Sequence, residues 1–145
     1  MACDLAAGRI DLPGGQIAAS PHWVVEHCVG PLGVGSLIVK PARHVVSVGE
    51  LNADEADELG SVLRRAAAVV DALVEPEQVY VGLWSHAGRQ RVHIHFVVQP
   101  ATTEAIARIG SHGPALPAGQ FDLDERPPRA EVEVFCEEAR KIFWT

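Results

Sequence analysis

The segment NADEADELGSVLRRAAAVVDALV, at residues 52–74, constrains the fold most, because it predicts one long amphipathic helix among short apolar runs. Asn52 suits an N-cap, and Glu55 follows three residues later, where a capping box places a glutamate. Apolar residues then recur at spacings of four and three, as on one face of a helix, at Leu59, Leu63, Ala66, Val70 and Leu73. Pro76 ends the predicted helix.

Short strand-like runs lie on both sides of this helix. Three precede it and two follow it, at Gln16–Ala19, His22–Cys28, Leu37–Val39, Gln78–Ser85 and Arg91–Gln99. The glycine-containing turn HAGRQ joins the last two runs and indicates an antiparallel pair. The rest of the chain predicts a short helix capped by Thr102 or Thr103, a Gly- and Pro-rich loop at 111–128, and a final helix at Pro128–Ile142.

This order of elements predicts an α+β fold with a mostly antiparallel sheet. We expect a single domain over residues 1–145, with its core at about 3–100 and the C-terminal loop and helix at 101–145. A chain of 145 residues is long enough to bury a hydrophobic core.

Charge and cysteine content narrow the class of protein. The formal charge of −7 argues against a nucleic-acid polymer or an anionic membrane as the partner. Cys3, Cys28 and Cys136 are scattered and odd in number, which favours a reducing compartment over a disulfide scaffold. The sequence has neither the pattern of a signal peptide nor an apolar run long enough for a membrane helix. We therefore expect a cytoplasmic protein.

Two histidines lie one residue apart in the run RVHIHFVVQP. Side chains alternate along a strand, so His93 and His95 point to the same side. One face of the run is apolar and consists of Val92, Ile94, Phe96 and Val98. The other face consists of Arg91, His93, His95, Val97 and Gln99. A face with two imidazoles is costly to bury unless the nitrogens are satisfied, which indicates the wall of a site.

Three interpretations of the pair remain open on the residues alone. Two imidazoles on a strand can bind zinc, here with Cys3 or a further histidine as the third ligand. An imidazole can also attack phosphorus while its neighbour orients it. The third interpretation is two ordinary histidines that are hydrogen-bonded at the edge of a sheet.

The run GRQRVHIHFVVQP resembles the signature of the histidine triad (HIT) family, in which three histidines alternate with apolar residues. The segment GVGSLIVKPARH and the helix that follows resemble family segments in the same order, so that the resemblance covers about residues 3–100. In the family a Pro or Gly stands three residues after the third histidine. Pro100 therefore makes His93 the first position, His95 the central one and Val97 the third.

The resemblance implies a five-stranded, mostly antiparallel sheet with one long central helix and a C-terminal helix. It implies that His95 is the nucleophile, forming a nucleotidyl-histidine, and that His93 supports it. The expected activity is that of a nucleotide phosphohydrolase or nucleotidyl transferase acting on dinucleoside polyphosphates or nucleoside phosphoramidates. A small-molecule nucleotide is then the ligand, a homodimer the expected assembly, and no cofactor is expected unless zinc binds.

The sequence departs from the family pattern at several positions. Val97 replaces a triad histidine, Ser36 replaces another family histidine, and Cys28 falls where an acidic residue usually holds the ribose hydroxyls. The matching positions predict that Gln90 reaches the leaving group and that His44 lies near the site. These departures leave an alternative open, a non-catalytic nucleotide-binding or interaction module.

Two further residues are candidates from their place on the strand. Arg91 and Gln99 share the face of the two histidines, and we expect Arg91 to hold phosphate in place of the missing donor. The predicted substrate-binding residues are thus Gln90, Arg91, Ser36, His44, Cys28 and Gln99.

Overall fold

The computed structural model describes residues 11–85 and 91–145. Its five strands form one antiparallel sheet in the order β1-β2-β3-β5-β4. Their bounds are Gln16–Ala19 (β1), Trp23–His27 (β2), Leu37–Pro41 (β3), Gln78–Leu83 (β4) and Phe96–Ala101 (β5). The predicted α+β class and the five-stranded antiparallel sheet are confirmed.

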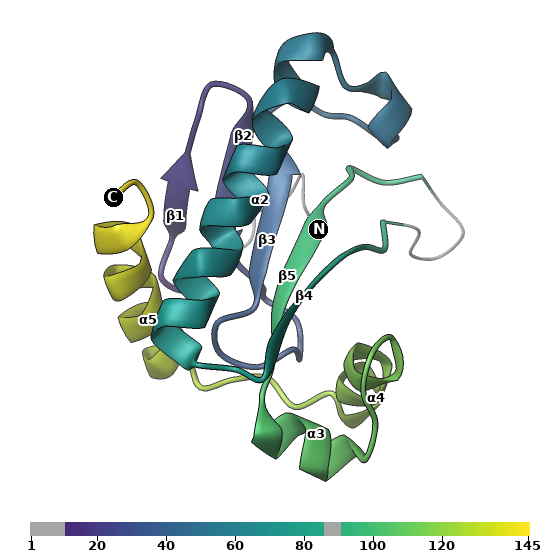
Figure 1. Cartoon of the computed structure of the whole chain (residues 1–145), viewed down its shortest axis with the longest axis vertical. Helices are drawn as coiled ribbons and strands as arrows, with labels where there is room; N and C mark the ends of the chain where they lie inside the picture. The colour runs from purple at the N-terminus through teal and green to yellow at the C-terminus, as the bar shows by residue number, and fades with distance from the viewer. Residues whose placement is uncertain (1–10, 86–90) are drawn as a thin grey trace.

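The long helix α2 (Ala53–Val74) lies across one face of the sheet (Figure 1). The predicted capping box is present, because the Asn52 side chain accepts from the Glu55 N–H and the Glu55 side chain accepts from the Asn52 N–H. The predicted apolar face is confirmed in part, since Ala66 and Val70 are buried and Leu59 and Leu63 pack against the core. Val62 and Val69 are buried in addition, whereas Leu73 is 36% exposed. Arg65 donates to the carbonyl of Phe143, the residue that follows α5.

The C-terminal helix α5 (Arg129–Ile142) packs beside α2 and β1. Its predicted apolar face is confirmed, since Val132, Phe135 and Ala139 are buried in the core. Cys136 lies on the same face, and burial raises the pKa of its thiol to about 11, which makes it unreactive.

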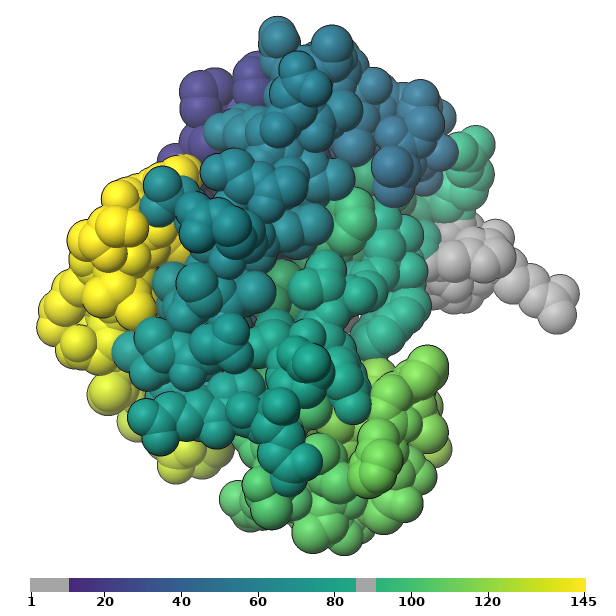
Figure 2. Space-filling model, in the orientation of Figure 1, coloured from purple at the N-terminus to yellow at the C-terminus, as the bar shows by residue number. Residues whose placement is uncertain are grey.

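Two short helices stand between β5 and α5. Helix α3 (Thr103–Ile109) begins at Thr102, whose hydroxyl accepts from the Ala105 N–H, as predicted. The prediction of a continuous loop at 111–128 is wrong, because α4 occupies Ala115–Leu123. Pro117 lies in its first turn, where a proline costs no hydrogen bond, and Leu116 is fully buried. In Figure 2 these helices protrude from the lower edge of the molecule.

The strand predicted at Arg91–Gln99 begins later in the structure, so that the two histidines precede it. β5 begins at Phe96, so Arg91–His95 precede it, and β4 ends at Leu83 rather than Ser85. The pairing of β5 with β4 also ends here, because Leu83, the last residue of β4, pairs with Phe96. Beyond this point the Ile94 N–H donates to the Val45 carbonyl instead of continuing the ladder. A 3₁₀ turn at Val48–Glu50 then leads into α2.

Within the described residues, no helix combines the length and apolar character that crossing a membrane requires.

Candidate active site

His95 is held at the start of β5 by contacts to its ring and backbone. Its Nδ1 lies 3.2 Å from the His93 carbonyl oxygen. A carbonyl only accepts hydrogen bonds, so Nδ1 carries the proton and donates it. In the neutral ring the lone pair therefore resides on Nε2, which is the form that a nucleophilic imidazole needs.

Ser85, just after β4, is a site residue that the sequence analysis missed. Its hydroxyl accepts from the His95 backbone N–H at 2.9 Å and lies 3.4 Å from His95 Nδ1. The hydroxyl thereby ties the histidine to the end of β4 from the neighbouring strand. The only signal in the sequence is a small polar residue between an apolar strand and a glycine-containing turn, and many loops share it.

His93 supports His95 through its backbone, while its own ring points elsewhere. The ring is 4% exposed, and its Nε2 donates to the Pro41 carbonyl at 3.0 Å. The ring of the exposed His44 meets it edge-on, with centroids 5.2 Å apart. Burial lowers the pKa of His93, and the positive charges of His44, Lys40 and His95 lower it further, against an opposing effect of the Pro41 hydrogen bond.

Two of the predicted substrate-binding residues lie away from His95, at the other end of the same strands. Ser36 is fully buried, and its hydroxyl donates to the Leu32 carbonyl at 2.8 Å. The Cys28 sulfur accepts from the Gly30 N–H, and burial raises the pKa of this thiol. Both side chains stabilise the turn between β2 and β3 in this structure.

Three further predicted substrate-binding residues are Gln99, Arg91 and Gln90. Gln99 is 1% exposed and four residues beyond His95, or roughly 13 Å along the strand. Its amide donates to Gln120 on α4, and its Oε1 has no hydrogen-bond partner among the described residues. Arg91 is exposed and lies 3.6 Å from a Glu50 carboxylate oxygen. Gln90 lies outside the described residues.

Val97, at the third triad position, is 5% exposed and pairs with Ile38 of β3 and Gly82 of β4. The third triad position is thus apolar. The Val97 side chain has no hydrogen-bond donor and cannot bind a phosphate oxygen.

His27, at the end of β2, is a buried histidine with a structural role. Its Nδ1 donates to the Cys28 carbonyl at 2.8 Å, and its Nε2 accepts from the Gly35 N–H at 2.9 Å. Gly35 has a positive φ, and a side chain there would collide with Val74, so the turn depends on glycine. Burial lowers the pKa of His27.

These lowered pKa values predict a pH-dependent stability. His27 and His93 accept a proton less readily when folded than when unfolded, where histidine titrates near 6.5. Their contribution is complete above about pH 6.5 and is lost as the pH falls below it, because the unfolded chain then binds more protons. We expect urea unfolding between pH 5 and 8 to show this loss, with a shallower pH dependence for His27→Gln. Equal slopes for the two proteins would contradict the assignment.

The zinc alternative finds no ligand cluster in residues 11–85 and 91–145, where no three histidine, cysteine or acidic side chains come together around one point. Cys3, the suggested third ligand, lies outside the described residues.

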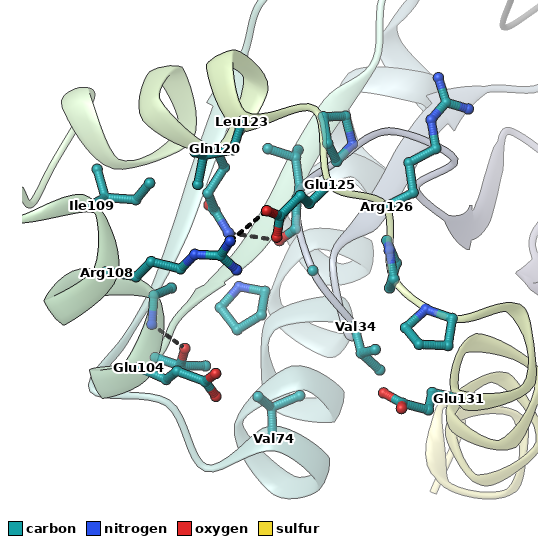
Figure 3. A pocket seen from close by; sticks show the side chains of 18 residues that line it. Val34, Val74, Glu104, Arg108, Ile109, Gln120, Leu123, Glu125, Arg126 and Glu131 are labelled. Atoms are coloured by element: carbon teal, nitrogen blue, oxygen red, sulfur yellow. Dashed lines mark hydrogen bonds and ion pairs between the residues drawn. The ribbon is translucent and has the colours of Figure 1, made fainter.

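A separate cavity of about 440 Å³ lies at the C-terminal end of β5, away from His95. Figure 3 shows Arg108 of α3 and Glu125, in the segment after α4, facing each other across it as an ion pair. Gln120 also lines this cavity and donates to the Leu32 carbonyl. The cavity thus lies between the C-terminal helices and the turn between β2 and β3, and residues of both line it.

No protein-family model matches the sequence. A search of curated proteins also gives no match. Similarity appears only at the level of structure.

Solved structures of histidine triad proteins share the fold. A Hit-like protein involved in cell-cycle regulation from Bartonella henselae is 13% identical, with a TM-score of 0.68 over 96% of this chain and 92% of its own. A hypothetical histidine triad nucleotide-binding protein from Sulfolobus tokodaii is 14% identical, with a TM-score of 0.70 over 98% and 90%. A zinc-bound histidine triad family protein from Mycobacterium smegmatis is 16% identical, with a TM-score of 0.65 over 98% and 91%. The chain therefore has the HIT-like fold that the sequence resemblance implied.

Proposed function

We propose that this protein is a nucleotide hydrolase or nucleotidyl transferase in which His95 attacks the α-phosphate of a bound nucleotide. The observation that carries the proposal is the contact between His95 Nδ1 and the His93 carbonyl, which leaves the lone pair on Nε2. The fold supports it as well, since one neighbour in structure is described as a histidine triad nucleotide-binding protein.

In the first step Nε2 forms a bond to the α-phosphorus, and the bond from phosphorus to the leaving group breaks. The leaving group departs with the bonding electron pair, as the second nucleoside with the remaining phosphates from a dinucleoside polyphosphate, or as an amine, after protonation, from a phosphoramidate. In the second step water attacks phosphorus, the N–P bond breaks, and a nucleoside monophosphate is released. Ser85 and the His93 carbonyl orient the ring throughout.

The test uses a panel of dinucleoside polyphosphates and of amidates of AMP and GMP. Rapid quenching at alkaline pH, followed by peptide mass spectrometry, is expected to find the nucleotidyl group on His95. Turnover without any adduct on the peptide that contains His95, even in substrate excess, would contradict the mechanism.

Ser85 offers a smaller prediction on the same reaction. Ser85→Ala removes one neutral hydrogen bond that orients His95, and such a bond is worth about 1 kcal/mol, or roughly fivefold in rate. We expect kcat to fall by this factor while KM is unchanged. Ser85→Thr keeps the hydroxyl and should retain wild-type kcat. A change in KM alone would indicate a contact with substrate instead.

A second candidate function is a nucleotide-binding module without turnover. The buried Val97, and Ser36 and Cys28 with their side chains engaged in the turn, favour it, because each replaces a family residue that handles substrate. Calorimetry with AMP and GMP separates the candidates, since binding without turnover supports the module. We also propose a homodimer through β4, an edge strand of the sheet, because Val81 on it is 48% exposed and Trp84 just after it is 46% exposed. Analytical ultracentrifugation measures the assembly.

A further inference from the structure

A buried ion pair lies on the sheet face opposite α2. Lys40 Nζ of β3 is 2.6 Å from Glu26 Oε1 of β2, and the two side chains are 2% and 4% exposed. Burying two charges costs several kcal/mol per ion in lost hydration, which their attraction only roughly offsets. Such a pair is often no more stabilising than two apolar side chains of similar size. A contribution to folding stability therefore does not by itself explain why this position holds a buried ion pair.

The pair lies near the start of β5, which His95 precedes. Val39 of β3 pairs with Phe96, the first residue of β5, so Lys40 follows this last pair on one strand and His95 precedes it on the other. Val39 is fully buried in the core under α2, and Phe96 packs against that core. Because side chains alternate along β3, Lys40 points to the opposite face of the sheet.

The orientation of the pair places its positive end nearer the histidines. The strand order β2-β3-β5 puts Lys40 between Glu26 and His95. In agreement with this, the charge of Lys40 lowers the pKa of His93, after the larger effect of burial, whereas Glu26 is not among the groups that act on it. A buried charge acts over a longer distance than an exposed one, since less water screens it.

We propose that Lys40 is a positioning residue of this site, whose ammonium group, held by Glu26, stabilises the negative charge of the phosphate that His95 attacks. The inference rests on the proposed function of His95. It also accounts for a triad that tolerates valine at its third position: Lys40 supplies positive charge from the neighbouring strand, where Val97 offers none. Lys40 takes no part in bond making.

The test removes both charges together. In Glu26→Leu/Lys40→Met two apolar side chains of similar length replace the pair, so the fold should be retained. We expect an unfolding midpoint at or above that of the wild type, and kcat/KM lowered about 10²-fold with most of the loss in kcat. Lys40→Arg, which keeps the charge beside Glu26, should recover most of the activity. The control is Glu138→Leu/Lys141→Met, an exposed pair on α5 at 2.6 Å, which should leave kcat/KM unchanged.

A binding measurement tests the charge without turnover. We expect calorimetry to show that the double variant loses affinity for AMP relative to adenosine, because only AMP carries the phosphate. If the apolar pair does not fold, Glu26→Gln/Lys40→Gln retains a hydrogen bond without charge and takes its place. Should the wild type show no turnover, the proposed function fails, and the AMP-to-adenosine ratio still decides the role of Lys40. Wild-type kinetics, or an unchanged ratio, in the uncharged variant would mean that the pair is only structural.

Discussion

His95→Ala is expected to reduce turnover of dinucleoside polyphosphates and nucleoside phosphoramidates by at least about 10³-fold, because it removes the nucleophile rather than a supporting contact. The loss should appear in kcat and kcat/KM together, because the variant lacks the attacking group. His93 does not substitute, because its own Nε2 donates to the Pro41 carbonyl. Nucleotide affinity should change little, so calorimetry with AMP separates loss of chemistry from loss of binding.

The matched control is His112→Ala, which makes the same substitution at an exposed histidine between α3 and α4. It should retain wild-type kinetics and stability. The thermal midpoint of His95→Ala is measured alongside, because His95 is not part of the buried core and the fold should persist. Equal rates for His95→Ala and the wild type would mean that any activity originates elsewhere.

Local signals in the sequence predicted the framework of the fold. The capping box of Asn52 and Glu55 depends on residues three positions apart, and it is present as predicted. The same holds for Thr102 at α3 and for the apolar face of α5. The details of burial depend on long-range packing: Val62 and Val69 are buried although they were not on the predicted face of α2, and Leu73 is 36% exposed. The helix α4 was missed because its Gly and Pro residues resemble a loop.

Only the part of the site that follows from the alternation of side chains along a strand could be predicted from the sequence. That pattern predicted one common side for His93 and His95, but both residues precede β5, and it did not predict the backbone carbonyl that accepts from His95. Ser85 meets His95 beyond the paired part of β4 and β5, and Lys40 lies on β3; the register of these strands cannot be derived from either segment alone. Ser36 and Cys28 were assigned to substrate by position in the family pattern, whereas their side chains bond to the adjoining turn. The positive charge that we propose for the site is on Lys40, a residue that the family pattern did not mark.

The position of His95 also depends on the core behind it. Phe96, the next residue, packs in tilted contact with Trp23, with ring centroids 6.1 Å apart. Trp23 is fully buried and its indole N–H donates to the Glu55 carbonyl at 3.0 Å, so it links β2 to the first turn of α2. One side chain thus connects the capped start of the helix to the strand that presents the nucleophile.

Trp23→Ala is accordingly expected to cost about 3–5 kcal/mol of unfolding free energy, through the cavity it leaves. A domain of this kind has only about 5–15 kcal/mol in total, so the variant should be partly unfolded at 37 °C. Urea unfolding followed by circular dichroism measures the loss. Trp84→Ala, at a tryptophan that is 46% exposed, is the control and should change stability by no more than about 0.5 kcal/mol. Similar losses in both variants would show that Trp23 does not anchor the core, and Trp23→Phe, which keeps an aromatic ring against Phe96, should fall between the wild type and Trp23→Ala.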